Sequence, residues 1–207
     1  MSSLEYNEDY FEKGEELGIS GYTDYKWMPT RTLETANEII RRSKIGVNDM
    51  ILDYGCAKGF LVKAFKWLGY NAKGYDISDY AITHCDEEIK NQIYNKNIVF
   101  GENQFDFVIC KDVVEHIEKE ELYEFLRRIY TICQKAIFII PLGNGRKYNI
   151  PKFENDTTHK IRQPIGWWLR KLEEVGFEVV QVSDDMNKIK PNWNSPMANI
   201  YVEVKKW

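Results

Sequence analysis

The stretch Met50-Ile-Leu-Asp-Tyr-Gly-Cys-Ala-Lys-Gly-Phe60 is followed further along the chain by Gly74-Tyr-Asp76. The apolar start of the first stretch predicts a buried strand, and its glycines predict a tight turn into a helix. The second stretch predicts another strand that ends in a carboxylate. A helix offers free backbone N–H groups at its start, and an acid about 20 residues after the turn can accept hydrogen bonds from ribose hydroxyls. Together the two stretches predict a nucleotide pocket within a βαβ unit.

Asp53 narrows the choice of nucleotide. In a dinucleotide enzyme the glycine turn faces a pyrophosphate, which a carboxylate two residues before the first glycine would repel. The Gly-x-Gly-x-x-Gly fingerprint of such enzymes is also missing from the sequence. S-adenosylmethionine carries an ammonium next to a sulfonium at one end and two ribose hydroxyls at the other, so it suits one acid at each strand end, Asp53 and Asp76. An ordinary strand-to-helix turn is the alternative interpretation.

At these residues the chain resembles the class I S-adenosylmethionine-dependent methyltransferases, whose first motif is roughly Leu-Asp-x-Gly-Cys-Gly-x-Gly. The resemblance extends from about Arg31 to Trp207, with Ala57 at the position where the family most often has its middle glycine. It implies transfer of a methyl group from S-adenosylmethionine, with S-adenosylhomocysteine as product. We expect the cofactor to be bound by Asp53, Gly55, Cys56, Ala57, Gly59, Asp76, Ile77, Lys111, Asp112 and Tyr25.

Length and the N-terminal sequence limit the class of protein. The chain has 207 residues, which is typical of about one domain with one core. It contains no run of about 18 apolar residues, which a transmembrane helix requires. Its start, Met1-Ser-Ser-Leu-Glu-Tyr-Asn-Glu-Asp-Tyr10, is acidic where a signal peptide would be basic and then apolar. We therefore expect no membrane segment and a cytoplasmic location.

Charge and cysteine content argue against a nucleic-acid-binding, disulfide-bonded or zinc-binding protein. The net charge is −4 and the basic residues are spread along the chain, so nothing favours a nucleic acid as partner. The cysteines stand singly, without Cys-x-x-Cys spacing, at Cys56, Cys85, Cys110 and Cys133. We expect no disulfide and no zinc site, and a small molecule as the methyl acceptor. The oligomeric state is not readable from the sequence.

Strands and helices alternate along the chain. Apolar spacing predicts helices over about 31–43, 61–68, 122–129 and 163–175, and a further helix capped by Ser78 and ending near Lys90. Strands are predicted at 50–53, before 76, weakly at 98–100 as a sheet edge, and at 105–110, 136–140, 177–182 and 198–204, with a polar turn rich in Asn and Pro before the last. This alternation predicts an α/β, Rossmann-like, doubly wound and mostly parallel sheet with helices on both faces. The resemblance implies seven strands with the last one antiparallel.

Residues 1–30 differ from the rest of the chain. They carry aromatic residues outside the predicted strands, interrupted by glycines: Tyr6, Tyr10, Phe11, Tyr22, Tyr25 and Trp27. We expect this segment to form a lid over the cofactor, where Tyr10, Tyr22, Tyr25 and Trp27 surround the sulfonium through cation–π attraction. Packing of these rings on the back of the sheet is the alternative. Residues 31–207 are expected to form a single catalytic domain.

Methyl transfer is an in-line displacement, so the protein must align the reactants and remove the proton of a hydroxyl acceptor. Of the three histidines, His84 falls inside a predicted helix among acids and is expected at the surface. His116, in Asp112-Val-Val-Glu-His116, and His159, in Asp156-Thr-Thr-His159, follow strands that end at one rim. We expect His159 to be the general base, with His116 as the second choice and Asp112 beside them. A purely structural role for these histidines is the alternative.

A metal site is a further possibility at the same residues. In some family members that methylate RNA ends or quinol precursors, a Glu-His pair after this strand and a later histidine hold magnesium. Asp112, Glu115, His116 and His159 match that pattern in part. Because two histidines are an unusual choice for a hard cation that prefers oxygen, we predict no metal and no magnesium here.

The sequence says less about the methyl acceptor than about the cofactor. The loop from Pro141 to Asp156 is long enough to help form its pocket, and basic residues gather in and after it: Arg146, Lys147, Lys152, Lys160 and Arg162. An oxygen of a sugar or of a phosphorylated or otherwise anionic metabolite is therefore our expected acceptor, and a solvated loop is the alternative. A magnesium-assisted RNA-end methyltransferase and a non-catalytic S-adenosylmethionine-binding partner subunit are the competing functions.

Overall fold

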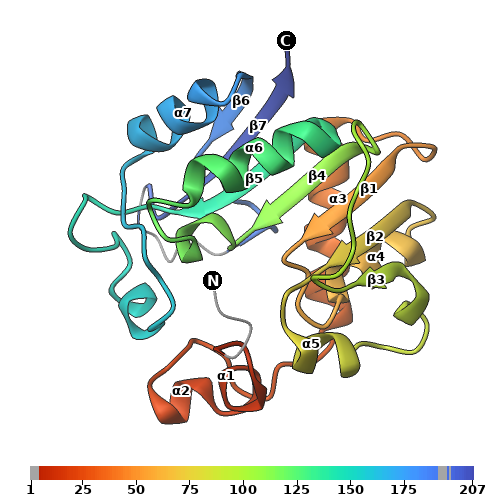
Figure 1. Cartoon of the computed structure of the whole chain (residues 1–207). Helices are drawn as coiled ribbons and strands as arrows, with labels where there is room; N and C mark the ends of the chain where they lie inside the picture. Colours follow the sequence, from red (N-terminus) through yellow and green to blue (C-terminus); the bar gives the residue numbers. More distant parts are fainter. Residues whose placement is uncertain (1–4, 191–194, 196) are drawn as a thin grey trace.

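The computed structural model describes residues 5–190, 195 and 197–207. Seven strands form one sheet in the order β3-β2-β1-β4-β5-β7-β6 (Figure 1). The strands are β1 (Met50–Tyr54), β2 (Asn71–Tyr75), β3 (Ile93–Tyr94), β4 (Phe105–Lys111), β5 (Cys133–Pro141), β6 (Phe177–Ser183) and β7 (Asn199–Lys206). Strands β1 to β5 pair in parallel, and β7 runs antiparallel to both β5 and β6. The predicted fold class is confirmed, including the reversed last strand.

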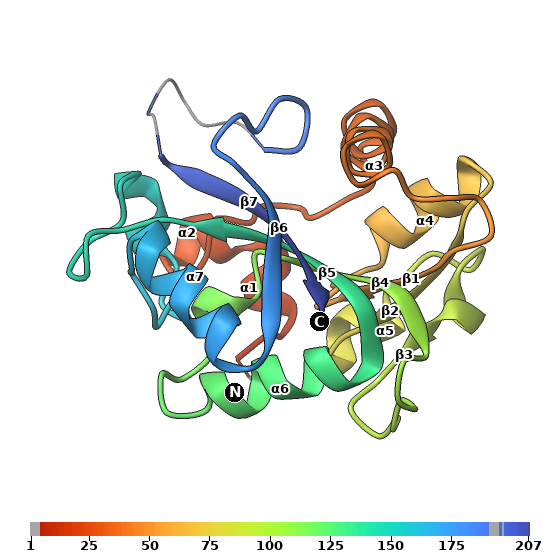
Figure 2. The ribbon, with the colours of Figure 1, turned by 90° about the horizontal axis from the view of Figure 1, so that it is seen from above.

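Helices cover both faces of the sheet (Figure 2). One face carries α3 (Pro29–Ser43) and α4 (Phe60–Trp67), and the other carries α6 (Leu122–Ile132) and α7 (Ile165–Glu174). Because successive strand residues point to opposite faces, Ile51 belongs to the core on the face of α3 and α4, and its neighbour Leu52 belongs to the core on the opposite face. Burial on both faces explains the continuous apolar runs of the central strands.

The region between β2 and β4 departs from the prediction. Ser78 caps a helix as expected, accepting a hydrogen bond from the Ala81 N–H, but α5 (Asp79–Thr83) ends well before Lys90. The Asp86 side chain accepts from the backbone N–H of Glu88, a local bond that competes with helical hydrogen bonding. A short 3₁₀ turn, η1 (Lys90–Gln92), then leads into β3.

The edge strand also lies elsewhere than predicted. The prediction of a strand at 98–100 is wrong: β3 is Ile93–Tyr94, and Val99 is 91% exposed. Ile93 pairs with Gly74, and a Cβ on that glycine would lie 2.7 Å from the Ile93 side chain. The absence of a side chain at Gly74 thus makes room for Ile93 at this position of the sheet.

Smaller expectations concern His84, the turn before β7, the cysteines and membrane-spanning helices. The exposed ring of His84 lies at the C-terminal end of α5, stacked on Tyr80, rather than in mid-helix. The polar turn before β7 falls largely on residues 191–196, most of which lie outside the described residues. All four cysteines are buried free thiols. Among the described residues, no helix is both long enough and apolar enough to cross a bilayer.

The parallel strands β1, β2, β4 and β5 end at one edge of the sheet. The N-terminal helices α1 (Glu8–Glu12) and α2 (Gly14–Leu17) lie beyond this edge, below it in Figure 1. Two short 3₁₀ turns, η2 (Val114–His116) and η3 (Pro151–Asn155), follow β4 and β5. The loops that carry the predicted motifs are therefore gathered at one end of the molecule.

Candidate active site

The turn between β1 and α4 requires glycine at two positions. Gly55 and Gly59 have positive φ angles of 87° and 76°. A Cβ would lie 2.5 Å from Val113 at Gly55 and 2.6 Å from Ile89 at Gly59, which is closer than side chains can approach. Ala57, between them, also has a positive φ, 49°, although it carries a side chain. The turn thus keeps the backbone shape of a glycine-rich motif at its one substituted position.

Asp76 is held against this turn by backbone groups. Its carboxylate accepts hydrogen bonds from the N–H of Ala57 at 2.7 Å and from the N–H of Ser78 at 2.8 Å. Burial raises the pKa of Asp76, and these backbone hydrogen bonds oppose the rise. Together with Tyr75 and Ile77 it lines a cavity of about 550 Å³. The acid predicted to bind ribose hydroxyls therefore lies beside the turn, next to an apolar surface.

Asp53 lines a second cavity, of about 530 Å³, on the other side of the turn. Its side chain is 4% exposed, and this burial raises its pKa from 3.8 to about 7. The positive charge of Lys111 opposes the rise, and the negative charge of Asp76 adds to it. The two cavities adjoin, since both are lined by Tyr10, Tyr22, Gly55, Ala57, Asp112 and His116.

Asp112 is held by two lysines. Its carboxylate oxygens lie 2.6 Å from the Lys111 ammonium and 2.5 Å from the Lys190 ammonium. These cations hold the pKa of Asp112 well below its usual range, although burial alone would raise it. Lys190, which follows β6 and also lines the cavity of Asp53, was not predicted from the sequence. No local motif around it signals its place, because its partner is 78 positions away in the chain.

The predicted histidines come together from two loops. The rings of His116, in η2, and His159, after η3, have centroids 4.6 Å apart. Burial lowers the pKa of His116 to about 4, helped by the proximity of His159, and burial also lowers the pKa of His159. Both imidazoles are therefore neutral near pH 7. Both line the cavity of Asp53.

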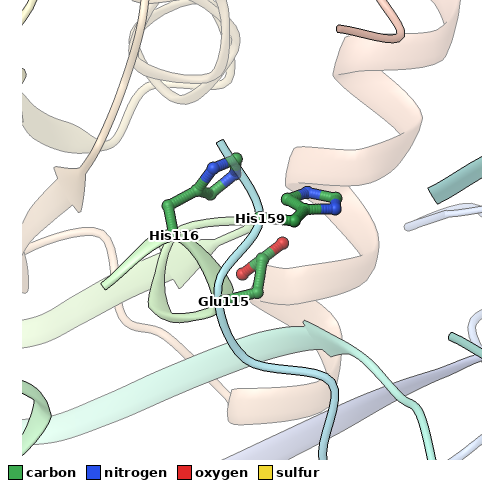
Figure 3. A group of neighbouring side chains, drawn as sticks. All are labelled: Glu115, His116 and His159. Carbon is green, nitrogen blue, oxygen red and sulfur yellow. The ribbon is translucent and has the colours of Figure 1, made fainter. Parts of the chain in front are cut away.

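Glu115, which we expected only as part of the metal alternative, completes this group. Its side chain is fully buried, and burial together with the charge of Asp112 raises its pKa well above the usual range. Figure 3 shows its carboxylate directed toward the two imidazole rings. One ligand atom from each of Glu115, His116 and His159 lies within 4.8 Å of the others.

The N-terminal segment contributes aromatic rings to the cavities. Tyr25 lines the cavity of Asp53, and its ring centroid lies 5.0 Å from that of Phe60. Tyr10 and Tyr22 line both cavities. Trp27, which we grouped with them, packs instead against Phe60 and Trp67. The segment is fixed to the turn by Lys58, which bonds to Glu12 and to the Tyr25 carbonyl.

Comparison with known proteins gives matches consistent with this geometry. A family model described as "Methyltransferase domain" matches residues 52–140. The ubiquinone biosynthesis O-methyltransferases of two strains of Rickettsia bellii are 29% identical over 165 residues, and the alignment covers 71% of this chain and 66% of those relatives. Solved S-adenosylmethionine-dependent methyltransferases share the fold. The protein from Archaeoglobus fulgidus has a TM-score of 0.67 at 19% identity, covering 85% of this chain and 94% of that one. The protein from Clostridium acetobutylicum has a TM-score of 0.63 at 14% identity, covering 86% and 92%.

The sheet order and the acid-flanked glycine turn are those of the Rossmann-like fold that these methyltransferases share. The family model and the solved structures that this chain resembles are those of S-adenosylmethionine-dependent methyltransferases, the family whose first motif it resembles.

Proposed function

We propose that this methyltransferase transfers the methyl group of S-adenosylmethionine to an oxygen atom of a small acceptor molecule. The observation that carries the proposal is the adjacency of the two cavities. One is lined by Asp76 and Ile77, and the other by Asp53 and the buried histidines. A cofactor that occupies the first and reaches into the second would present its methyl group beside His116 and His159.

The residues fit the cofactor in charge and in hydrogen bonding. Each oxygen of Asp76 uses one lone pair on a backbone N–H, so the remaining lone pairs are available to two ribose hydroxyls. Asp53, when ionised, would attract the ammonium of the amino-acid end. Tyr10, Tyr22 and Tyr25 would enclose the sulfonium, which is the lid role predicted for residues 1–30. The bound cofactor supplies an electrophilic methyl carbon with a neutral thioether as leaving group.

Oxygen is favoured as the acceptor atom because the site offers neutral, buried imidazoles. A hydroxyl acceptor must lose its proton as the O–C bond forms, and a neutral histidine can accept it. We keep His159 as the first candidate for this base and His116 as the second. The Rickettsia relatives, which are O-methyltransferases, support the same acceptor atom.

The chemical class of the acceptor has weaker support. Of the basic residues expected to bind an anion, Arg162 is paired with Glu154 and Lys160 with Glu118. Lys152 and Lys190 are ion-paired as well, with Glu15 and Asp112, but both line the cavity. We therefore propose a small hydroxylated acceptor, whose anionic group, if it has one, would lie near these two lysines rather than near Arg162.

Two measurements test the function in order. Calorimetric titration with S-adenosylmethionine should give binding with one site per chain, and release of S-adenosylhomocysteine should then identify acceptors in a panel of sugar phosphates, carboxylates and dihydroxy-aromatic compounds. Absence of cofactor binding would overturn the proposal. Cofactor binding without turnover of any acceptor, including RNA ends, would instead favour a non-catalytic partner subunit.

A further inference from the structure

Glu115 brings a carboxylate without a partner into the cavity of Asp53. Its side chain has no exposed surface, and neither carboxylate oxygen has a hydrogen-bond partner within residues 5–190, 195 and 197–207. Burial of an unpaired carboxylate is costly, so such groups normally face a cation or a hydrogen-bond donor. Without one, Glu115 keeps a proton, because burial raises its pKa. The carboxylate thus marks a position in the cavity where a bound cation would gain an ionised partner.

The hydrogen bonds of Thr158 fix the tautomer of His116. The Thr158 hydroxyl lies 2.6 Å from a carboxylate oxygen of Asp156, which only accepts, so the hydroxyl proton points there. The Thr158 oxygen then accepts from Nδ1 of His116, at 2.8 Å. Nδ1 carries the proton of the neutral ring, and Nε2 carries a lone pair.

His159 has the same tautomer for a different reason. Its Nδ1 lies 2.8 Å from the backbone carbonyl oxygen of Phe153, which only accepts, so this nitrogen carries the proton. Its Nε2 is 4.0 Å from the nearest oxygen of Asp156, beyond hydrogen-bond distance. Both histidines therefore have an unprotonated Nε2, and no donor from the described part of the chain is hydrogen-bonded to either one.

The three groups converge from two loops. Figure 3 shows the Glu115 carboxylate directed toward both rings, and one ligand atom from each of Glu115, His116 and His159 lies within 4.8 Å of the others. A carboxylate and two unprotonated Nε2 atoms all accept hydrogen bonds, so a bound anion would meet only lone pairs here. A molecule that occupies this part of the cavity has to supply hydrogen-bond donors.

The basic residues of the cavity do not provide the missing cation. Its lysines are ion-paired with other carboxylates: Lys26, Lys111, Lys152 and Lys190. Arg31, the remaining positively charged side chain among the described residues that line the cavity, is exposed. Under the proposed function the ammonium of S-adenosylmethionine pairs with Asp53, which leaves Glu115 for a second cation.

We propose that the methyl acceptor is an amino alcohol whose primary ammonium is bound by Glu115 and by Nε2 of one of the two histidines. An ammonium has three N–H donors and no acceptor, and its hydrogen bonds to a carboxylate are stronger than those between neutral groups. A neutral hydroxyl would leave the charge of an ionised Glu115 uncompensated. The inference rests on the proposed function and deepens it by naming the class of acceptor, of which an amino sugar is one example.

The ammonium also explains why oxygen rather than nitrogen would receive the methyl group. A protonated nitrogen has no lone pair and cannot attack the methyl carbon. The neighbouring hydroxyl oxygen would form the new bond to that carbon while its proton passes to Nε2 of the other histidine. The electron pair of the breaking S–C bond would stay on sulfur, as the neutral thioether of S-adenosylhomocysteine. One histidine thus binds the acceptor and the other acts as the base.

Nuclear magnetic resonance of the histidine rings tests the ammonium site without methyl transfer. The probes are two matched pairs, ethanolamine with ethylene glycol and glucosamine with glucose. Each is added to the chelator-treated full chain saturated with S-adenosylhomocysteine, whose own ammonium would occupy Asp53. The ring signals of His116 and His159 should shift with each amine, while the exposed His84 serves as the reference. We expect each amine to bind at least about tenfold more tightly than its hydroxyl partner.

Glu115→Gln keeps the size of the side chain and removes its charge, so it should abolish the preference for the amines. Calorimetric titration with S-adenosylhomocysteine checks that this variant is folded. Glu118→Gln is the matched control, because Glu118 is an exposed acid in the same loop that pairs with Lys160 outside the cavity. It should keep the full preference for the amines.

The outcomes separate this inference from the proposed function. Equal binding within both pairs, or an amine preference that survives in Glu115→Gln, would overturn the ammonium site. Should the amines bind as expected to a chain that does not bind S-adenosylmethionine, the ammonium site stands and the proposed function falls. Turnover confined to acceptors without an amino group would overturn the class of acceptor and leave the methyltransferase function in place.

Discussion

The hydroxyl of Tyr10 donates a hydrogen bond of 2.8 Å to the carboxylate of Asp156, a residue 146 positions further along the chain. The other oxygen of Asp156 accepts from Thr158, whose hydroxyl in turn accepts from His116. This chain of hydrogen bonds connects the N-terminal segment directly to a histidine of the site. If the segment is a lid, its closed position and the orientation of His116 depend on each other.

Tyr10→Phe should loosen the N-terminal segment. The change keeps the ring and removes one hydrogen bond to a buried carboxylate, which is worth about 1.5–3 kcal/mol. We expect hydrogen exchange of the backbone amides in residues 14–25 to become at least about tenfold faster, and S-adenosylmethionine to suppress this exchange less well than in the unchanged protein. Exchange measured by mass spectrometry, with and without cofactor, checks both effects.

The matched control for Tyr10→Phe is Tyr148→Phe. The Tyr148 hydroxyl is also buried and donates to the backbone carbonyl of Ile161, and its ring packs against Phe153 and His159, outside the N-terminal segment. Its loss should leave exchange in residues 14–25 unchanged. Equal acceleration in both variants would mean that general loss of stability, rather than the bond to Asp156, controls the segment.

The framework of the site was predictable because it depends on local patterns. Apolar runs such as Ala136 to Ile140 predict buried strands, and the chain direction places their ends, and hence His116 and His159, at one edge. The exception is β3. Its position depends on the room that Gly74 leaves for the Ile93 side chain and not on an apolar run of its own.

The pairing of side chains inside the site could not be predicted in the same way. Lys190 reaches Asp112 across 78 positions, and Tyr10 of α1 reaches Asp156 across 146. Lys190, Asp112 and Asp156 all lie in loops. Loop conformations are set by such contacts and not by periodicity, so a single sequence contains no signal for them. The unsatisfied carboxylate of Glu115 likewise becomes visible only when its surroundings are known.

Asp76→Ala should abolish most of the affinity for the cofactor. We expect the dissociation constant for S-adenosylmethionine to rise by about 100-fold, because hydrogen bonds from ribose hydroxyls to a charged acceptor are lost, at roughly 1.5–3 kcal/mol each. Calorimetric titration measures the change. Asp79→Ala removes an exposed acid nearby in the chain, paired with Lys96, and should bind the cofactor normally. Unchanged affinity in Asp76→Ala would contradict the assigned cofactor pocket.

Cofactor affinity should depend on the protonation of Asp53. Its pKa is about 7, so the carboxylate is charged above that pH and neutral below it. Because only the charged form attracts the ammonium of S-adenosylmethionine, affinity should fall by up to about tenfold per pH unit below pH 7. Asp53→Asn should bind weakly at every pH in the titrated range. A flat profile in the unchanged protein would show that Asp53 does not contact the cationic end.

The Asp53 carboxylate should also make the ligand-free protein less stable at alkaline pH. Its folded pKa of about 7 lies above the ordinary 3.8, so the neutral form is favoured by folding. The contribution of Asp53 to stability is therefore present at pH 3.8 and below, and it is lost as the pH rises through 7. We expect Asp53→Asn to raise the melting temperature at pH 8 but not at pH 4, by an amount that corresponds to a few kcal/mol at most. An equal effect at both values would contradict the shifted pKa.

Ala57→Gly should stabilise the protein without weakening cofactor binding. A left-handed conformation costs an alanine about 1–2 kcal/mol, and Ala57 has a φ of 49°. Glycine removes that strain but gains entropy in the unfolded chain, worth about 0.4–1 kcal/mol, so we expect a net gain of roughly 0.5–1 kcal/mol. For a chain of this size that is about 1–4 °C in melting temperature, measurable by calorimetry. Ala64→Gly makes the same substitution inside α4, where the helix gains nothing from glycine, and should lower the melting temperature instead. A decrease in both variants would mean that the methyl group of Ala57 contributes more through its packing against the N-terminal aromatic residues than its backbone conformation costs.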